Sequence, residues 1–354
     1  MRKLGILVIF LGCAGAAFGI WLHHELYSSY KGYAAPFEFV DIPRGTSRHE
    51  IAELLETQGV VRNALAFELY SRWHTRQTLQ AGEYDFDHPM NPREVFGMIA
   101  AGKIYVHEVQ VLEGWTMFDI ADELARDGLC SRDDFLAAAR DPSLVRDLAP
   151  DAQTLEGYLF PATYEFTRHT SCSEIATAMV EHFRAVWTRI SSRNGDAPEQ
   201  SPENVVSLAS LVERETPLAS ERPLIAGVFT NRMRKGLPLQ CDPTVQYALA
   251  LAGHPARSIT AEDLKIRSPY NTYLQPGLPP GPIANPGEVA LAAALAPEKT
   301  QYFYFVANNE GGHFFSSTLA EHNRNVARYR RRLAGLPDTP APAARRAKGH
   351  RRNQ

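Results

Sequence analysis

The chain has 354 residues, a length that suggests two domains, with 44% hydrophobic and 22% charged residues. This composition is close to the average for globular proteins, so it excludes disordered, collagen-like and multi-span membrane proteins. The formal net charge of −3 hides an asymmetry, because ten of the 37 basic residues but only one of the 40 acidic residues lie from Arg324 onward. The body is therefore acidic, and we expect no nucleic-acid partner.

The first predicted element is an uncharged run of 19 residues from Leu4 to Leu22. As a helix rising about 1.5 Å per residue, this run would cross the hydrocarbon core of a bilayer. Residues 1–3 contain two basic side chains, so the positive-inside bias places them in the cytoplasm and the bulk of the chain outside. A cleaved signal peptide ending near Ala16 and a lipoprotein using Cys13 are alternatives, but the apolar run continues past both. We expect an uncleaved single-span anchor at 4–22.

An internal repeat follows the anchor. The segment VDIPRG at 40–45 recurs as VQVLEG at 109–114, and the Ile-Ala, Leu and Gly positions after it recur as well. Each copy predicts a short strand, a glycine turn and an amphipathic helix. Between the copies, 81–86 predicts another strand, and Asn91 predicts the cap of a helix that ends near residue 101. The pattern resembles LysM-type modules, which bind N-acetylglucosamine polymers; a plain α+β packing unit is an equal alternative.

The remainder of the chain changes from this pattern to longer helical periodicities and then to loops. Helices are predicted over 173–192, 202–215 and 221–236, Pro/Gly-rich loops over 275–287, strands over 302–307 and 313–316, and a last helix over 321–333. Of the two strands, we expect 302–307 to be buried. Residues 335–354 are rich in Pro, Ala and Arg, so we expect a disordered basic tail.

Common catalytic and metal-binding motifs are absent from the sequence. It contains no HExxH, GxSxG, GxGxxG or Walker loop. The four cysteines, Cys13, Cys130, Cys172 and Cys241, form no CxxC pair and have no metal-ligand spacing. We therefore expect no metal site, zinc ribbon or disulfide framework. Cys241 has no histidine nearby in the sequence, which argues against a thiol nucleophile.

The helix predicted over 202–215 carries the candidate catalytic group. At about 100° per residue, Glu213 falls inside the apolar sector, Arg214 faces solvent and Glu215 lies on the opposite flank. Burial raises the pKa of a carboxyl group toward the range of a general acid. For this helix alone, a structural ion pair of Glu213 with Arg222 or Arg232 is the stronger alternative. Two glutamates two positions apart point away from each other, so Glu213 and Glu215 are not a hydrolase pair.

Several blocks in the same order along the chain resemble the endolytic murein transglycosylase family (MltG/YceG-like). The blocks are LEGYLFP at 155–161, ASLVERET at 209–216, LQCDPTV at 239–245, YNTY at 270–273 and GLPPGPIANPG at 277–287. Shorter matches continue to the final predicted helix. Cys241 stands where the family usually has a small polar residue, which is a mild change.

The resemblance implies an α+β fold in three parts: a single transmembrane helix at 4–22, LysM-like modules at 37–150 and an α+β catalytic domain at 151–334. It implies a location in the inner membrane with the catalytic domain in the periplasm. The implied reaction cuts peptidoglycan strands between N-acetylmuramic acid and N-acetylglucosamine and leaves 1,6-anhydro ends. No metal or organic cofactor is implied. Peptidoglycan synthases are implied partners, and limiting the length of nascent strands is the implied role.

The resemblance also assigns residues. The family's catalytic glutamate matches Glu213, which would act as acid and then as base because the sugar's own 6-hydroxyl replaces water. Polar and aromatic loop positions suit sugar binding, although turn formation is their alternative; these positions are Gln240, Asp242, Asn271, Tyr273 and Asn285. Glu156 and Glu215 are candidate supporting residues. Two rival functions remain open, a non-catalytic peptidoglycan-binding scaffold and a hydrolase that uses Asp242 as its second carboxylate.

Overall fold

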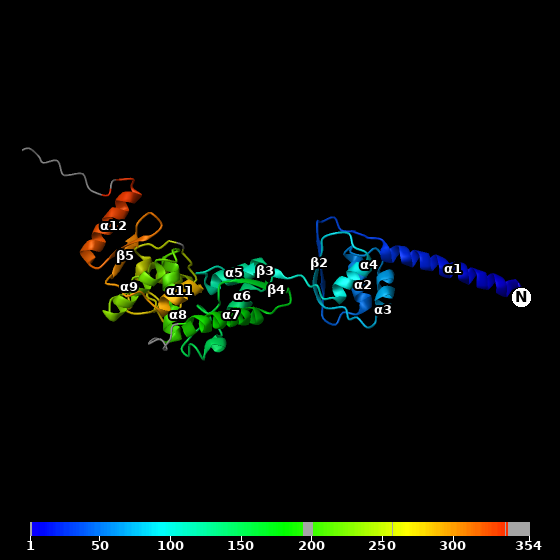
Figure 1. Ribbon diagram of the computed structural model, residues 1–354, viewed down its shortest axis with the longest axis horizontal. Coiled ribbons are helices and arrows are strands. Elements are labelled where there is room, and N and C mark those ends of the chain that lie inside the picture. The colour runs from blue at the N-terminus through cyan, green and yellow to red at the C-terminus, as the bar shows by residue number, and fades with distance from the viewer. Residues whose placement is uncertain (1, 194–200, 257, 337, 339–354) are drawn as a thin grey trace, which may run out of the picture. The chain divides into compact units, whose positions relative to one another are not determined.

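The computed structural model describes residues 2–193, 201–256, 258–336 and 338, and it combines helices with short strands (Figure 1). The chain forms two compact units. The N-terminal unit consists of Met1–Val109, Leu124–Cys130 and Thr163–Ser171, and the C-terminal unit consists of Gln110–Glu123, Ser131–Ala162 and Cys172–Gln354.

The predicted anchor is a single helix, α1 (Arg2–Tyr27). Its stretch Lys3–Tyr27 is long and apolar enough to cross a membrane, and its large apolar side chains from Leu4 to Ile20 are exposed. The helix continues five residues beyond the uncharged run that ends at Leu22. Near its C-terminal end, Leu22 and Leu26 are buried against Ala66. The last turns of α1 are thus part of the N-terminal unit.

The first copy of the repeat folds around an antiparallel strand pair. Strands β1 (Glu38–Ile42) and β2 (Gly82–Phe86) pair so that Val40 lies opposite Tyr84. Between and after them come α2 (Arg48–Thr57), α3 (Ala64–Trp73) and α4 (Pro92–Ala100). The Asn91 side chain accepts hydrogen bonds at the start of α4, as predicted, and Glu94 completes a capping box. The strands and helices predicted for this region are confirmed.

The second copy repeats the order strand, helix, helix, strand. It comprises β3 (His107–Gln110), α5 (Met117–Arg126), α6 (Arg132–Ala139), a short 3-10 helix η1 (Pro142–Val145) and β4 (Thr163–Phe166). Strand β4 pairs with β3, just as β2 pairs with β1. This second copy therefore runs past residue 150, into residues that we assigned from the sequence to the catalytic domain. The pairing of β3 with β4 was not predicted, because the two strands are far apart in the chain and a local pattern does not show such a pairing.

From Cys172 onward the C-terminal unit is mainly helical. It contains α7 (Cys172–Arg193), α8 (Pro202–Glu215), α9 (Arg222–Arg234), α10 (Asp242–Leu251), the 3-10 helix η2 (Asp263–Lys265), α11 (Glu288–Leu295), a hairpin of β5 (Tyr304–Ala307) and β6 (His313–Ser316), and α12 (Leu319–Leu333). Helix α8 is central, because α9, α10 and α11 all pack against it; α8, α9 and α11 are labelled in Figure 1. The positions of its side chains therefore set the geometry of the site.

Two local predictions differ from the structure, and one helix was not predicted. Strand β5 is half-buried rather than buried, because a two-stranded hairpin leaves part of its surface to solvent. Helix α10 begins where Asp242-Pro243 suggested a turn, since proline is also well suited to the first turn of a helix. Helix α11 has the sequence EVALAAAL, whose nearly uniform apolar character gives no helical period.

The cysteines correct one expectation. Cys130 and Cys172 are each disulfide-bonded, whereas Cys13 and Cys241 are free. Their spacing in the sequence gives no local signal of disulfide formation, so these bonded cysteines were not expected. No group of three or more His, Cys, Asp or Glu side chains within the described ranges could hold a metal ion.

Most of the predicted tail at 335–354 lies outside the described residues. One described member, Asp338, forms ion pairs with two arginines of α12. Its carboxylate lies 2.7 Å from Nε of Arg328 and 2.8 Å from Nε of Arg332.

Candidate active site

The candidate site centres on the carboxylate of Glu213, near the C-terminal end of α8. Only 4% of this side chain is exposed. Its Oε1 accepts a hydrogen bond from Nη2 of Arg222 at 2.5 Å, and its Oε2 accepts one from the backbone N–H of Gly287 at 3.0 Å. The helical period predicted both the burial of Glu213 and the exposure of Arg214, and both are confirmed. The alternative that Glu213 pairs with Arg222 is also realised.

Arg222 connects Glu213 with a second carboxylate. The guanidinium lies in the first turn of α9, and 6% of the side chain is exposed. Its Nη2 also lies 3.3 Å from Oε2 of Glu113, in the turn after β3. Glu113 is 49% exposed, so it extends from the buried ion pair to the solvent. The cluster of Glu113, Glu213 and Arg222 is called the carboxylate–arginine cluster below.

Glu113 was not predicted as a site residue, because Leu-Glu-Gly resembles an ordinary turn. One signal was available within the internal repeat. At the position where the second copy has Glu113, the first copy has Arg44. The two copies match around this position but carry opposite charges at it. The fold of the repeat therefore does not require a glutamate there, which singles out Glu113.

Gly287 allows this cluster to form. A Cβ atom at this position would lie 1.9 Å from Oε1 of Glu113, so only glycine leaves room for that carboxylate. Gly287 is also the N-cap of α11, and its N–H donates to Glu213. The N-terminus of a helix carries partial positive charge, which stabilises a nearby carboxylate.

The pKa of Glu213 is raised above its ordinary value, mainly because burial removes water from the charged form. The Gly287 hydrogen bond and the positive charges of Arg222 and Arg214 oppose this rise, and the negative charge of Glu113 adds to it. The net effect favours a protonated carboxyl at higher pH than usual. That is the property that a general acid requires.

Asn285 is fully buried and uses all of its hydrogen-bonding capacity within the protein. Its Oδ1 accepts the backbone N–H groups of Gly157 and Leu159 at 2.8 and 3.0 Å. Its Nδ2 donates to the carbonyl of Trp115 and to Oε1 of Glu156, both at 2.9 Å. The side chain therefore joins three segments of the C-terminal unit and has no free group for a sugar.

Glu156 is the buried partner of this asparagine. Its two carboxyl oxygens accept the N–H of Met117 at 3.0 and 3.1 Å. Burial raises the pKa of Glu156 to about 8. Backbone hydrogen bonds also join Gly114 and Trp115 to Asn285. Through these contacts, Glu156 and Asn285 attach the turn that contains Glu113 to the loop that contains Gly287.

Asn271 has the same character as Asn285. It is fully buried, its Nδ2 donates to the carbonyls of Leu264 and Ile266 at 2.9 Å, and its Oδ1 accepts the N–H of Tyr273 at 3.0 Å. The turn-forming alternative considered from the sequence describes these contacts. A sequence shows that a loop amide is polar but not whether it points inward.

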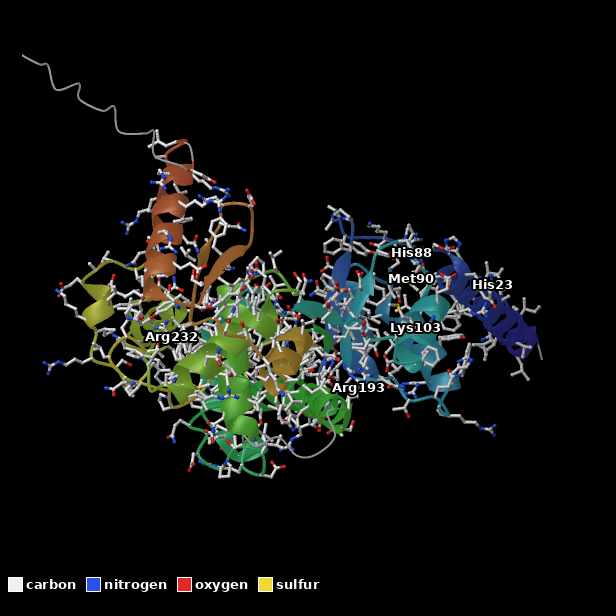
Figure 2. The ribbon with its side chains drawn as sticks, turned by 60° about the vertical axis from the view of Figure 1, so that its left-hand side comes forward. His23, His88, Met90, Lys103, Arg193 and Arg232 are labelled. Carbon is white, nitrogen blue, oxygen red and sulfur yellow. The ribbon has the colours of Figure 1, made fainter. Side chains whose placement is uncertain are left out.

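The remaining predicted binding residues form a second cluster. Gln240 is exposed, and its Oε1 accepts a hydrogen bond at 2.6 Å from Nη2 of Arg232, which is labelled in Figure 2. The hydroxyl of Tyr273 donates to the exposed carboxylate of Asp242. Burial raises the pKa of the nearby Glu215, and the negative charge of Asp242 adds to this rise. A hydrogen bond with the Cys241 thiol and the charge of His313 oppose it.

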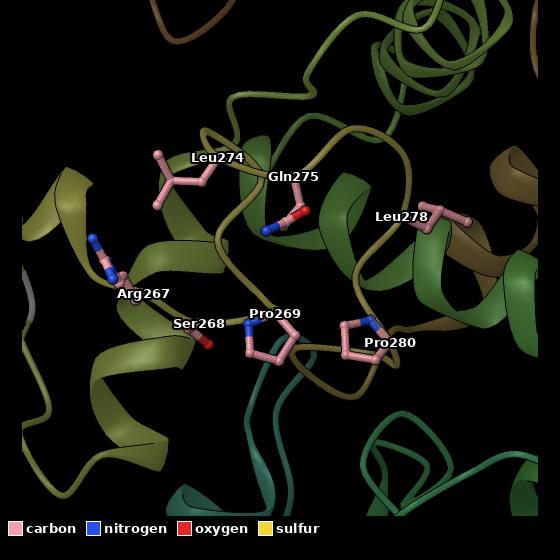
Figure 3. A pocket seen from close by; sticks show the side chains of 7 residues that line it. All are labelled: Arg267, Ser268, Pro269, Leu274, Gln275, Leu278 and Pro280. Carbon is pink, nitrogen blue, oxygen red and sulfur yellow. The ribbon is translucent and has the colours of Figure 1, made fainter.

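A cavity of about 830 Å³ opens in the loops that lead into the site (Figure 3). It is lined by Arg267, Ser268, Pro269, Leu274, Gln275, Leu278 and Pro280. Two of these residues, Leu278 and Pro280, belong to the segment 277–287 that ends at Gly287. The cavity thus shares a loop with the residues around Glu213.

Comparison with known proteins adds independent information. The model of the YceG-like family matches residues 40–328. An endolytic murein transglycosylase of Bacillus subtilis is 36% identical over 306 residues, which cover 82% of this chain and 84% of that protein. An endolytic murein transglycosylase of Streptococcus pneumoniae is 29% identical over 350 residues, and the match spans 89% of this chain but 62% of that longer protein. A crystal structure of a yceG-like protein from Listeria monocytogenes has a TM-score of 0.56 and 35% identity, covering 82% of this chain and 98% of that chain.

Proposed function

Because the chain belongs to the YceG-like family, we propose that it is an endolytic murein transglycosylase, a lyase that cleaves the glycan strands of peptidoglycan. The observation that carries this proposal is the buried carboxyl of Glu213, held between Arg222 and the N-terminus of α11 with a raised pKa. Two relatives that match most of this chain bear the name of this activity.

In the proposed reaction, one glutamate acts twice on the bond between N-acetylmuramic acid and N-acetylglucosamine. Protonated Glu213 donates its proton to the leaving oxygen as the bond to C1 breaks. The carboxylate then accepts the proton of the muramic 6-hydroxyl as that oxygen attacks C1, which gives a 1,6-anhydro end and restores the acid. Arg222 would stabilise the carboxylate between these steps. No water molecule is consumed.

The structure supports a division of roles among the other predicted residues. Gln240, Asp242 and Tyr273 have exposed or partly exposed polar groups, and we assign them to sugar contact. Asn271 and Asn285 are buried with their amides occupied, so we assign them to the support of the loops. Glu156 and Glu215 also support the site.

The repeat at 37–150 is assigned to glycan binding by LysM-like modules, and 151–334 to catalysis. The shared order of strand, helix, helix and strand in the two copies supports a pair of related modules. Binding by these modules would hold a strand near the enzyme that cuts it. The proposal also includes peptidoglycan synthases as partners of this protein, and a role in controlling the length of nascent strands.

The proposed location is the inner membrane, with the body in the periplasm. The basic residues before α1 favour a cytoplasmic N-terminus, and the disulfide-bonded Cys130 and Cys172 fit an oxidising compartment. We expect protease added to spheroplasts to digest the body and spare a short N-terminal piece. A body protected from protease, or a mature protein that starts near Ala17, would contradict this topology.

Digestion of purified sacculi tests the activity. The full-length protein in detergent is incubated with sacculi, and the soluble products are identified by mass spectrometry. We expect products that end in 1,6-anhydro-muramic acid. Reducing ends would indicate the hydrolase alternative, and intact sacculi would indicate the scaffold alternative.

A further inference from the structure

We propose that Glu113 is a positioning residue of the catalytic site, which shares Arg222 with Glu213 and thereby keeps Glu213 able to carry a proton. This inference rests on the proposed function, because it concerns how Glu213 acts as an acid. It assigns a role to a turn residue that neither the sequence motifs nor the predicted reaction includes.

The first support is the geometry of the guanidinium. Nη2 of Arg222 lies 2.5 Å from Oε1 of Glu213 and 3.3 Å from Oε2 of Glu113, and Nη1 lies 3.4 Å from the same oxygen of Glu113. A single guanidinium nitrogen therefore faces both carboxylates. Nε of Arg222 is buried and has no hydrogen-bond partner within the described part of the chain. The positive charge of the Arg222 guanidinium is thus shared between the carboxylates of Glu213 and Glu113 and is poorly screened by water.

The second support is that the turn carrying Glu113 is bonded to the loop that carries Gly287. The N–H of Gly114 donates to the carbonyl of Asn285 at 2.9 Å, and the N–H of Asn285 donates to the carbonyl of Trp115 at 2.8 Å. The carboxylate of Glu113 occupies the space that a Cβ atom of residue 287 would fill. The backbone bonds therefore place the turn beside the site, and the glycine leaves room for the carboxylate.

The third support is the balance of charge around Glu213. Arg222 faces it from α9, Arg214 extends from its own helix, and the positive end of α11 reaches it through Gly287. Glu113 is the negative group in this set. The two arginines and the Gly287 hydrogen bond lower the pKa of Glu213 against the larger effect of burial, and a lower pKa leaves less of the protonated form that can donate. Glu113 offsets their effect and lowers the cost of protonating Glu213.

The test is the pH dependence of kcat/KM for anhydro-product formation by the full-length protein in detergent. Activity of a general acid falls as pH rises through its pKa, which gives an alkaline limb. In Glu113→Gln the pKa of Glu213 should fall, so this limb should move about one pH unit toward acid. At pH values above the limb, that shift is roughly a tenfold loss. The acid plateau should stay close to that of the wild type.

Two further variants make the test specific. Gly287→Ala keeps Glu113 but displaces its carboxylate, so the limb should move in the same direction. Glu108→Gln removes an exposed glutamate five residues earlier and should leave the limb at its wild-type position. Melting temperatures identify any variant that does not fold. If Glu113→Gln or Gly287→Ala does not fold, the pH profile of the other one tests the role of Glu113.

The outcomes separate this inference from the function on which it rests. The role of Glu113 would be overturned if the alkaline limb of the folded Glu113→Gln and Gly287→Ala variants stays at its wild-type pH. It would also be overturned if these variants lose activity equally at every pH. A wild-type protein that forms no anhydro product would overturn the proposed function itself. An acid shift in Glu113→Gln or Gly287→Ala that Glu108→Gln does not share would support both.

Discussion

Replacing Glu213 with glutamine is expected to reduce turnover by at least about 10²–10⁴-fold, the usual contribution of general acid–base catalysis. Glutamine keeps an oxygen that can accept from Arg222 or Gly287, but it cannot release and recover a proton. Stability should change little, because the raised pKa of Glu213 indicates that its environment tolerates a neutral side chain. Glu113 also remains as a counter-charge for Arg222. Anhydro-product formation and melting temperature are measured together.

Glu215→Gln is the matched control for this prediction. It makes the same change two residues later on α8, beside Cys241 rather than Arg222. We expect it to retain much more activity. A folded Glu213→Gln enzyme that remains active, while Glu215→Gln or Asp242→Asn is inactive but folded, would show that the catalytic residue is misassigned.

Replacing Asn285 with alanine is expected to lower the free energy of unfolding by about 4 kcal/mol or more. The backbone N–H groups of Gly157 and Leu159 would be left buried without a partner, which costs about 1–3 kcal/mol each. The carbonyl of Trp115 and the carboxyl of Glu156 would each lose one hydrogen bond and keep another, which costs about 0.5–1.5 kcal/mol each. Denaturant unfolding of the full-length protein measures this change.

Gln275→Ala serves as the control for the asparagine. It removes an exposed amide from the same stretch of loops, so stability should change by no more than about 0.5 kcal/mol. If Asn285→Ala instead keeps its stability and raises only the KM for glycan, Asn285 contacts sugar and the supporting role is incorrect.

The sequence was most informative where one helix carries the signal. The period of α8 places Glu213 on its buried face and Arg214 in solvent, since those directions depend only on spacing within the helix. The capping residue Asn91 was likewise predictable, because caps are local. Arg222 was one of two partners that the sequence allowed, and only tertiary packing selects it over Arg232.

The rest of the site depends on segments that are distant in the chain. Glu113 and Gly287 meet Glu213 through the packing of a turn, α8 and the start of α11, which no local pattern encodes. The two loop asparagines, Asn271 and Asn285, face inward, although their residue type and loop position suit sugar binding equally well. Side-chain direction in an irregular loop is set by the tertiary hydrogen bonds, and the sequence does not contain that information in local form.

Cleavage of glycan strands in water enriched in the heavy oxygen isotope tests the central claim most directly. The claim is that Glu213 alone drives attack by the sugar's own 6-hydroxyl. It predicts new muramic ends with the anhydro mass, no incorporated solvent oxygen, and loss of these products in Glu213→Gln. Heavy oxygen at new reducing ends would contradict it, because water would then be the nucleophile and a second carboxylate would be required.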